Sequence, residues 1–180
     1  EDTLSLHDAL PIFLLFTSRS AMQAAYENLS DTFEAQGYTC LMQGQDTNKV
    51  LARRFAEDTN SVLFALKSFM TGVDFQGDTC RLVVIDKLPF PVPTEPVFEA
   101  RADLIKSEGR SDFRELTIPI MTLTLEQAFG RLIRTSADRG VVAIMDSRLT
   151  STGYGKQILR GLPDCPRTTD LLKVAEFYKA

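Results

Sequence analysis

The run Ile12-Phe13-Leu14-Leu15-Phe16 decides the fold class, because five consecutive apolar residues are typical of a strand buried on both faces of a parallel sheet. A second such run, Leu82-Val83-Val84-Ile85, lies further along the chain. Shorter patterns of the same kind predict three more strands, over residues 38–42, 62–66 and 140–145.

Helical patterns separate these strands. Apolar residues recur every three or four positions after Ser20, and Gly37 stands where such a helix would end: Met22, Tyr26, Leu29 and Phe33. Further helices are expected over 48–57, 97–106, 125–134 and 171–178, whereas four prolines between Leu88 and Pro96 forbid regular structure there. This alternation predicts an α/β fold with a mainly parallel sheet. We expect the fold to occupy residues 12–180, with residues 1–11 as a tail or an artefact outside it.

The composition excludes several classes of protein. A chain of 180 residues, 44% of them hydrophobic, suffices for one domain with a proper core. It contains no run of about 18 apolar residues and no secretory signal, so we expect a cytoplasmic protein without membrane contact. Because the net charge is −4, any contact with nucleic acid must come from a local groove.

Histidine and cysteine usage narrows the chemistry further. The only histidine is His7, near the start of the chain, which removes Ser-His-Asp, Cys-His and HExxH sites from consideration. The three cysteines lie far apart without a CxxC pair: Cys40, Cys80 and Cys165. They predict reduced thiols and no zinc or iron–sulfur site in this chain.

Three segments remain as candidates for chemistry, and the first two each follow a predicted strand. In an open parallel sheet the working residues lie beyond the carboxyl ends of the strands. Thr17-Ser18-Arg19-Ser20 suits either a helix N-cap or a phosphate contact. The segment 67–77, with Gly72 and Gly77 around Asp74, suits either a plain turn or a loop that closely approaches a ligand.

The third segment, Gln127-Ala128-Phe129-Gly130-Arg131-Leu132-Ile133-Arg134, carries the strongest signal. On a helix, Gln127, Arg131 and Arg134 project from one face. Two guanidinium groups side by side repel each other, so the site suits an anion such as phosphate, although a solvated basic face is the ordinary alternative.

The order and spacing of these segments resemble helicase motifs IV, V and VI of the DinG/XPD branch of superfamily 2. The resemblance rests on Leu14–Arg19, Ser68–Gly77 and Gln127–Arg134. It extends to Arg81–Pro93 with its prolines and to Asp146-Ser147-Arg148 with Tyr154-Gly155. One departure concerns motif V, where many members read Phe-Trp-Glu-Gly-Val-Asp but this chain has Met70 and Thr71, so an aromatic and an acidic contact are absent.

The resemblance implies a RecA-like fold that forms the second, C-terminal motor domain of an ATP-dependent DNA helicase acting in DNA repair or in replication conflicts. By this resemblance Arg131 and Arg134 would reach the γ-phosphate of ATP and Gln127 would help to position it. Gly72, Asp74 and Gly130 would line the nucleotide site. Single-stranded DNA would be held by four residues: Thr17, Ser18, Arg19 and Ser68.

The sequence lacks GxxxxGK[ST] and an acidic Walker B strand end. The resemblance therefore implies that a first RecA-like domain of the same polypeptide holds most of the ATP and Mg²⁺ contacts, and that a 4Fe–4S cluster, if the protein has one, lies in that half. Two alternatives stay open. One is an RNA helicase of the same superfamily, since motor contacts go to backbone phosphates. The other is a stand-alone nucleotide- or phosphate-binding α/β module.

Overall fold

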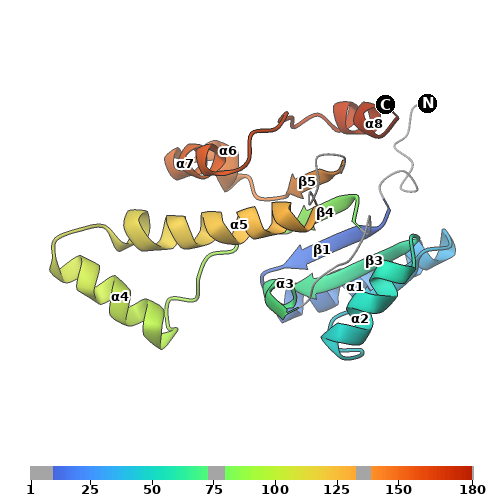
Figure 1. Ribbon diagram of the computed structural model, residues 1–180, viewed down its shortest axis with the longest axis horizontal. Coiled ribbons are helices and arrows are strands. Elements are labelled where there is room, and N and C mark those ends of the chain that lie inside the picture. The colour runs from blue at the N-terminus through green and yellow to red at the C-terminus, as the bar shows by residue number, and fades with distance from the viewer. Residues whose placement is uncertain (1–9, 73–79, 133–138, 180) are drawn as a thin grey trace.

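The structure is a computed structural model that describes residues 10–72, 80–132 and 139–179, and the side chains of all of these except 70–72 and 131–132. Its centre is a sheet of five parallel strands in the order β2-β3-β1-β4-β5 (Figure 1). The strands are β1 (Ile12–Phe16), β2 (Thr39–Met42), β3 (Ser61–Leu66), β4 (Leu82–Ile85) and β5 (Val141–Ile144). All five strands expected from the sequence are confirmed.

Helices cover both faces of the sheet. The first six are α1 (Arg19–Ala35), α2 (Asn48–Glu57), α3 (Lys67–Gly72), α4 (Pro96–Ser107), the π-helix η2 (Phe113–Thr117) and α5 (Ile118–Leu132). The last three are α6 (Arg148–Ser151), α7 (Gly153–Gly161) and α8 (Leu171–Lys179). The α/β class expected from the sequence is confirmed. In the described ranges, no helix is long and apolar enough to cross a membrane.

Alternate residues of each strand face two separate cores. Phe13 and Leu63 belong to the larger core, which also holds the apolar faces of α2, α5 and α7: Leu51, Phe55, Met121, Leu125 and Ile158. On the other face Val62 and Phe64 pack against Met22 and its neighbours on α1. Because side chains alternate along a strand, this division follows directly from the unbroken apolar runs.

Local sequence sets the limits of α1 and α2. The Ser18 side chain accepts a hydrogen bond from the Ala21 N–H at 3.2 Å, and that of Thr47 accepts one from Val50 at 3.4 Å, so each helix has an N-cap hydroxyl. Gly37, with φ of 84°, follows α1 in the left-handed region that favours glycine.

Two helical segments illustrate where the structure differs from the sequence predictions. The helix expected to begin at Leu125 begins at Ile118 and continues directly from η2, although Pro119 and several β-branched residues disfavour helix there. Burial of Ile118 and Met121 against the sheet offsets that preference. The segment expected to be a loop from Lys67 begins as the short helix α3, whose Phe69 is fully buried beside Phe13.

The start of the fold includes residues before β1. Leu10 is 4% exposed, Pro11 is buried, and the Pro11 carbonyl accepts a hydrogen bond from the Arg81 N–H at 3.0 Å. Packed residues therefore begin at least two positions before the boundary expected at Ile12, and residues 1–9 lie outside the described part of the chain.

Candidate functional site

The parallel sheet brings four predicted site residues to one edge. Thr17, Ser18 and Arg19 follow β1, and Ser68 lies just after β3. The last residues of these strands, Phe16 and Leu66, are register partners, so the two segments leave the sheet side by side. All four residues are exposed. This carboxyl edge presents three hydroxyl groups and one guanidinium group to solvent.

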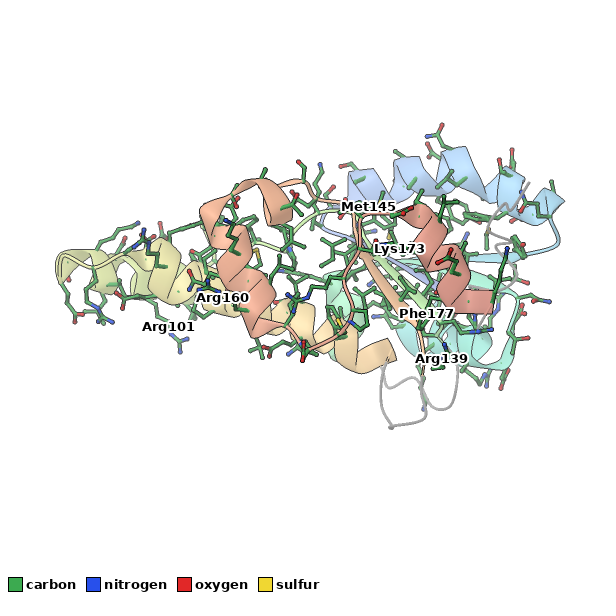
Figure 2. The ribbon with its side chains drawn as sticks, turned by 90° about the horizontal axis from the view of Figure 1, so that it is seen from above. Arg101, Arg139, Met145, Arg160, Lys173 and Phe177 are labelled. Atoms are coloured by element: carbon green, nitrogen blue, oxygen red, sulfur yellow. The ribbon has the colours of Figure 1, made fainter. Side chains whose placement is uncertain are left out.

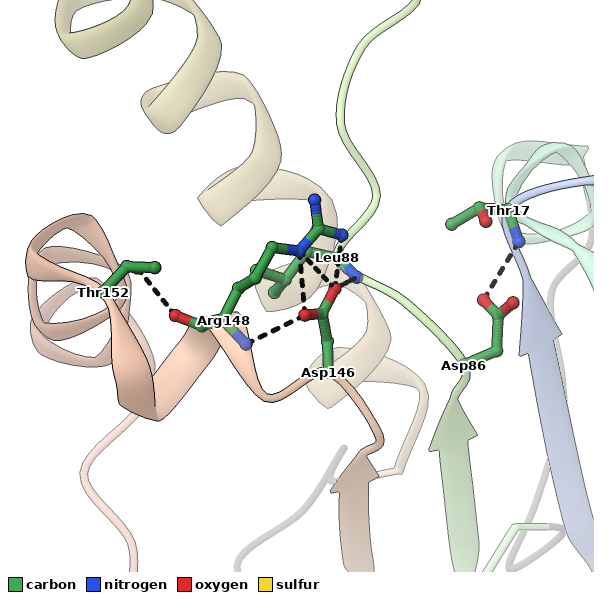
Figure 3. A network of polar contacts seen from close by, with 6 residues as sticks. All are labelled: Thr17, Asp86, Leu88, Asp146, Arg148 and Thr152. Atoms are coloured by element: carbon green, nitrogen blue, oxygen red, sulfur yellow. Dashed lines mark hydrogen bonds and ion pairs between the residues drawn. The ribbon is translucent and has the colours of Figure 1, made fainter.

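Hydrogen bonds within the chain hold the loop after β1. Ser18 caps α1, as the N-cap interpretation predicted, and its Oγ lies 3.3 Å from the Ser20 Oγ. The Thr17 N–H donates to Asp86 Oδ1 at 3.2 Å (Figure 3). Asp86 follows β4, the neighbour of β1, so one strand end fixes the backbone of the next. A phosphate at this loop would therefore meet side-chain hydroxyls, since the Thr17 amide is already paired.

Gln43, just after β2, belongs to the same edge, and the sequence analysis missed it. Its Oε1 accepts the Leu66 N–H at 2.8 Å, and its Nε2 lies 3.5 Å from the Ser68 Oγ as donor. The next residue, Gly44, has φ of 105°, and an added Cβ there would lie 3.9 Å from a terminal nitrogen of Arg19. The sequence feature that could have identified Gln43 is its position directly after a predicted strand, where ligand-binding residues of parallel sheets lie.

An ion pair between a buried carboxylate and a partly exposed arginine connects the carboxyl ends of β4 and β5. Asp146, whose side chain is 6% exposed, accepts from Arg148 Nη2 at 2.6 Å and Nε at 2.9 Å. The N–H groups of Leu88 and Arg148 donate to the same carboxylate at 2.9 and 3.0 Å (Figure 3). The hydrogen bonds from the Arg148 side chain hold the pKa of Asp146 well below its usual range, against the opposing effect of burial. The pKa of Arg148 is raised by the same bonds.

Arg148 also joins an aromatic cluster made of Phe90, Phe113 and Tyr154. Its guanidinium carbon lies 5.0 Å from the centre of the Phe90 ring. The Phe90 and Phe113 rings stack with centroids 6.3 Å apart, and Tyr154 meets Phe113 edge-on at 5.3 Å. The cluster thus ties the proline-rich segment after β4 to η2 and α7.

The other group of predicted residues lies on α5. Gln127 and Gly130 are exposed, on the side of the helix away from Leu125 and Ala128, which face the core. An added Cβ at Gly130 would meet no atom within 4 Å, so nothing in the described chain requires glycine there. In the middle of a helix, glycine costs about 1 kcal/mol relative to alanine. This face of α5 is therefore open.

Most of the remaining predicted residues can be placed only in part. Arg131 lies in α5, four positions after Gln127, but its side chain is outside the described part, and so are Asp74 and Arg134 altogether. Gly72 is the last residue of α3. The chain passes from the end of α5 to the start of β5, so α5 ends away from the carboxyl edge (Figure 1). Gln127 and Gly130 are thus not brought together with Thr17 and Ser68.

The thiols and possible metal ligands form no further site among the residues that the structure describes. Cys40, Cys80 and Cys165 form no disulfide bond, and Cys165 is exposed whereas Cys40 and Cys80 are buried. Burial, with a smaller contribution from Glu34, raises the pKa of the Cys40 thiol to about 11. The described residues contain no group of three or more His, Cys, Asp or Glu side chains placed to hold a metal ion.

Comparison with solved structures gives the same fold. An XPD helicase superposes with a TM-score of 0.64 at 19% sequence identity, over 83% of this chain and 27% of that chain. A second XPD structure, in its apo form, gives a TM-score of 0.63 at 20% identity over 83% of this chain and 30% of that one.

Comparison with curated sequences gives closer relatives. The ATP-dependent DNA helicase YoaA of Haemophilus influenzae is 43% identical over 168 residues, which is 93% of this chain and 26% of the relative. The ATP-dependent helicase DinG of Mycobacterium tuberculosis is 36% identical over 160 residues, or 89% of this chain and 24% of the relative. The chain thus spans about a quarter of these relatives. The sequence model of the helicase C-terminal domain matches residues 4–165, and the chain belongs to that family, in its DinG/XPD branch.

Proposed function

We propose that this chain is the second motor domain of an ATP-dependent DNA helicase, which couples ATP hydrolysis to movement along single-stranded DNA and to unwinding of the duplex. The two relatives reported above support this, since one is named an ATP-dependent DNA helicase and the other an ATP-dependent helicase. Its partner would be a first RecA-like domain of the same polypeptide, which would hold Mg²⁺ and most contacts to ATP. A DNA motor of this kind would act in the cytoplasm, in repair or in replication conflicts.

The observation that carries the proposal is the open face of α5. Gln127 and Gly130 are exposed on it, and the glycine has no packing role within the chain. A helix face that has glycine without a neighbour suits the close approach of another body, here ATP and the first motor domain. Arg131 follows Gln127 by four residues, a spacing that favours the same side of a helix.

In this position Arg131 and Arg134 would stabilise the charge that spreads over the phosphoryl oxygens as the γ-phosphate is transferred. Such arginines contribute a factor of roughly 10³ to 10⁵ in rate. Gln127 would help to orient the phosphate or the attacking water. Gly72 and Asp74 would line the nucleotide site from motif V.

The carboxyl edge would hold the DNA. Thr17, Ser18 and Ser68 offer hydroxyl donors and Arg19 offers a cation, a set that suits backbone phosphates and carries no base preference. We therefore expect binding to single strands that falls with salt and is independent of sequence. ATP would close the cleft between the two domains, and hydrolysis would open it, so that their grips on the strand alternate.

The decisive experiment replaces Arg131 and Arg134 by alanine, separately, in the complete helicase. DNA-stimulated ATP turnover should fall by about 10³-fold or more, while ATP affinity changes modestly and binding of single strands without nucleotide barely changes. Lysine should not rescue either position, because an ammonium group lacks the planar fork. Arg160→Ala on α7 removes a matched exposed arginine and should leave turnover intact. Near-normal turnover in both folded variants would refute the assignment.

A second test uses the 180-residue chain alone. It should hydrolyse no ATP, because its sequence offers arginines but neither a phosphate cradle nor a Walker B carboxylate. DNA-stimulated turnover by the pure chain would refute this expectation, whereas measurable affinity of the isolated chain for nucleotide would favour the stand-alone module.

A further inference from the structure

A groove of about 450 Å³ lies between α3, α4 and the proline-rich segment after β4. Val92 and Val97, on its rim, are 56% and 59% exposed. The groove therefore has an apolar lining contributed by the segment after β4 and by α4. It lies at the side of the carboxyl edge where β3 and β4 end. The apolar lining consists of Pro91, Val92, Val97, Phe98 and Ile120.

Among the described residues, three charged side chains also line this groove: Lys67, Glu95 and Arg101. Lys67 immediately precedes Ser68 of the carboxyl edge, and Arg101 lies on the protruding helix α4 (Figure 2). Among the residues that the structure describes, neither cation forms an ion pair. The balance of one acid against two bases favours an anion.

One wall of the groove, the proline-rich segment after β4, is fixed by contacts outside the groove. Phe90, next to Pro91, stacks on Phe113 and lies under Arg148. The Leu88 N–H, two residues earlier, donates to the buried Asp146 carboxylate. A groove held in this way needs little reorganisation when a ligand enters.

We propose that this groove binds one nucleotide of the single strand, with the base against the apolar lining and the flanking phosphates on Lys67 and Arg101. This inference rests on the proposed function. Lys67 is the residue next to Ser68, so single-stranded DNA bound at Ser68 also lies beside Lys67. Sequence-independent sites for single strands combine cations for the backbone with a surface on which bases stack, usually aromatic. In this groove the exposed part of that surface is aliphatic and includes Val92 and Val97.

The test measures binding of an oligothymidylate by the complete helicase without nucleotide, over a range of salt concentrations. The double variant Lys67→Gln/Arg101→Gln should raise Kd about tenfold and reduce the slope of log Kd against log salt by about 1.4, since each phosphate contact on a single strand contributes about 0.7. Lys173→Gln is the matched control, because Lys173 is an exposed cation on α8, far from Arg101 (Figure 2). It should leave both quantities unchanged.

Two further variants separate the two halves of the ligand. Glu95→Gln removes the one acid among the described residues that line the groove and should lower Kd about threefold, because the phosphates lose a repulsive neighbour. Val97→Ser should raise Kd about threefold with an unchanged salt slope, since it weakens only the surface offered to the base.

The outcomes distinguish the groove from the proposed function. An unaltered helicase that binds no single strand overturns both. Normal binding that Lys67→Gln/Arg101→Gln affects no more than Lys173→Gln does overturns the groove alone. A double variant that loses ATP turnover while its DNA affinity and salt slope stay normal also overturns it, and would identify the groove as a contact with the first motor domain.

Discussion

The carboxyl edge of the sheet and the open face of α5 both carry residues expected to contact phosphate, yet they differ in what surrounds them. At the edge, Ser18, Gln43 and Asp86 are hydrogen-bonded to backbone or side chains of neighbouring segments. On α5, Gln127 is exposed and Gly130 meets no neighbour. The contacts of the carboxyl edge are thus made within this chain. The α5 face, by contrast, is expected to be completed by ATP and the first motor domain. Substitutions at the edge should therefore lower stability as well as binding, whereas those on α5 should lower turnover without any loss of stability.

The largest effect on stability is expected at Gly155, where α7 packs closely on the backbone of α6, the helix that follows Asp146 at the carboxyl edge. An added Cβ would lie 2.1 Å from the Leu149 carbonyl oxygen and 2.7 Å from that of Arg148, and backbone atoms cannot rotate away. Gly155→Ala should lower the free energy of unfolding by about 3 kcal/mol in urea titrations of the chain. Gly153→Ala is the control in the same helix, since its Cβ meets nothing within 4 Å. Equal stability of the two variants would contradict this close packing.

A smaller loss is expected at Arg148. Arg148→Gln leaves the buried Asp146 carboxylate without its cation, at a cost of about 2 kcal/mol at pH 7, moderated because the arginine side chain is 45% exposed. Arg53→Gln, an exposed arginine of α2, should cost less than about 0.5 kcal/mol.

The same pair gives a pH dependence with a definite sign. Because the folded-state pKa of Asp146 is lowered, the pair stabilises the fold above the ordinary carboxyl pKa of about 4, and this stabilisation is lost as pH falls through the folded-state value. The difference between the unaltered chain and Arg148→Gln should therefore narrow as urea unfolding is repeated from pH 7 toward pH 3. A constant difference would show that packing on Phe90, and not the charge of Asp146, is the contribution of Arg148.

Gly130 tests whether the open face of α5 is completed by another part of the helicase. Gly130→Ala should raise the free energy of unfolding of the chain by up to about 1 kcal/mol, because alanine suits a helix interior and the added Cβ meets nothing. In the complete helicase the same change should lower DNA-stimulated ATP turnover about tenfold, or about 1.4 kcal/mol, since the methyl group occupies space meant for the second body. A variant that is more stable and fully active would show that the α5 face stays solvated.

The sequence predicted the strands well and the site only in part, for physical reasons. An unbroken apolar run such as Ile12–Phe16 has one stable placement, inside a parallel sheet, and α2 was predicted with its observed limits because Leu51 and Phe55 mark its buried face. The start of α5 was missed because Pro119 and the β-branched residues near it disfavour helix locally, and only packing on the sheet overrides them.

The residues missed at the edge share a different cause. Gln43 and Asp86 act through backbone amides of other strands, Leu66 and Thr17, and such pairs depend on strand order. The order β2-β3-β1-β4-β5 is not readable from the periodicity of any one segment. A lone glutamine or aspartate after a strand therefore looks the same in sequence whether it holds a neighbour or faces solvent.

The smallest effect is expected at Gln43, and it tests whether the edge is assembled in advance for DNA. Gln43→Leu leaves the Leu66 N–H without its acceptor and removes the donor to Ser68, so unfolding should become easier by about 1 kcal/mol. In the complete helicase the affinity for single strands should fall about threefold, because Ser68 is no longer oriented toward a phosphate. Gln157→Leu, at an exposed site on α7, should change neither the stability nor the affinity.

A double variant separates the two effects of Gln43→Leu. In a Ser68→Ala background the loss of stability should persist while the loss of affinity disappears, since the two substitutions act on DNA through one hydroxyl. Additive losses of affinity would show that Gln43 contacts the strand itself or acts on it through another group.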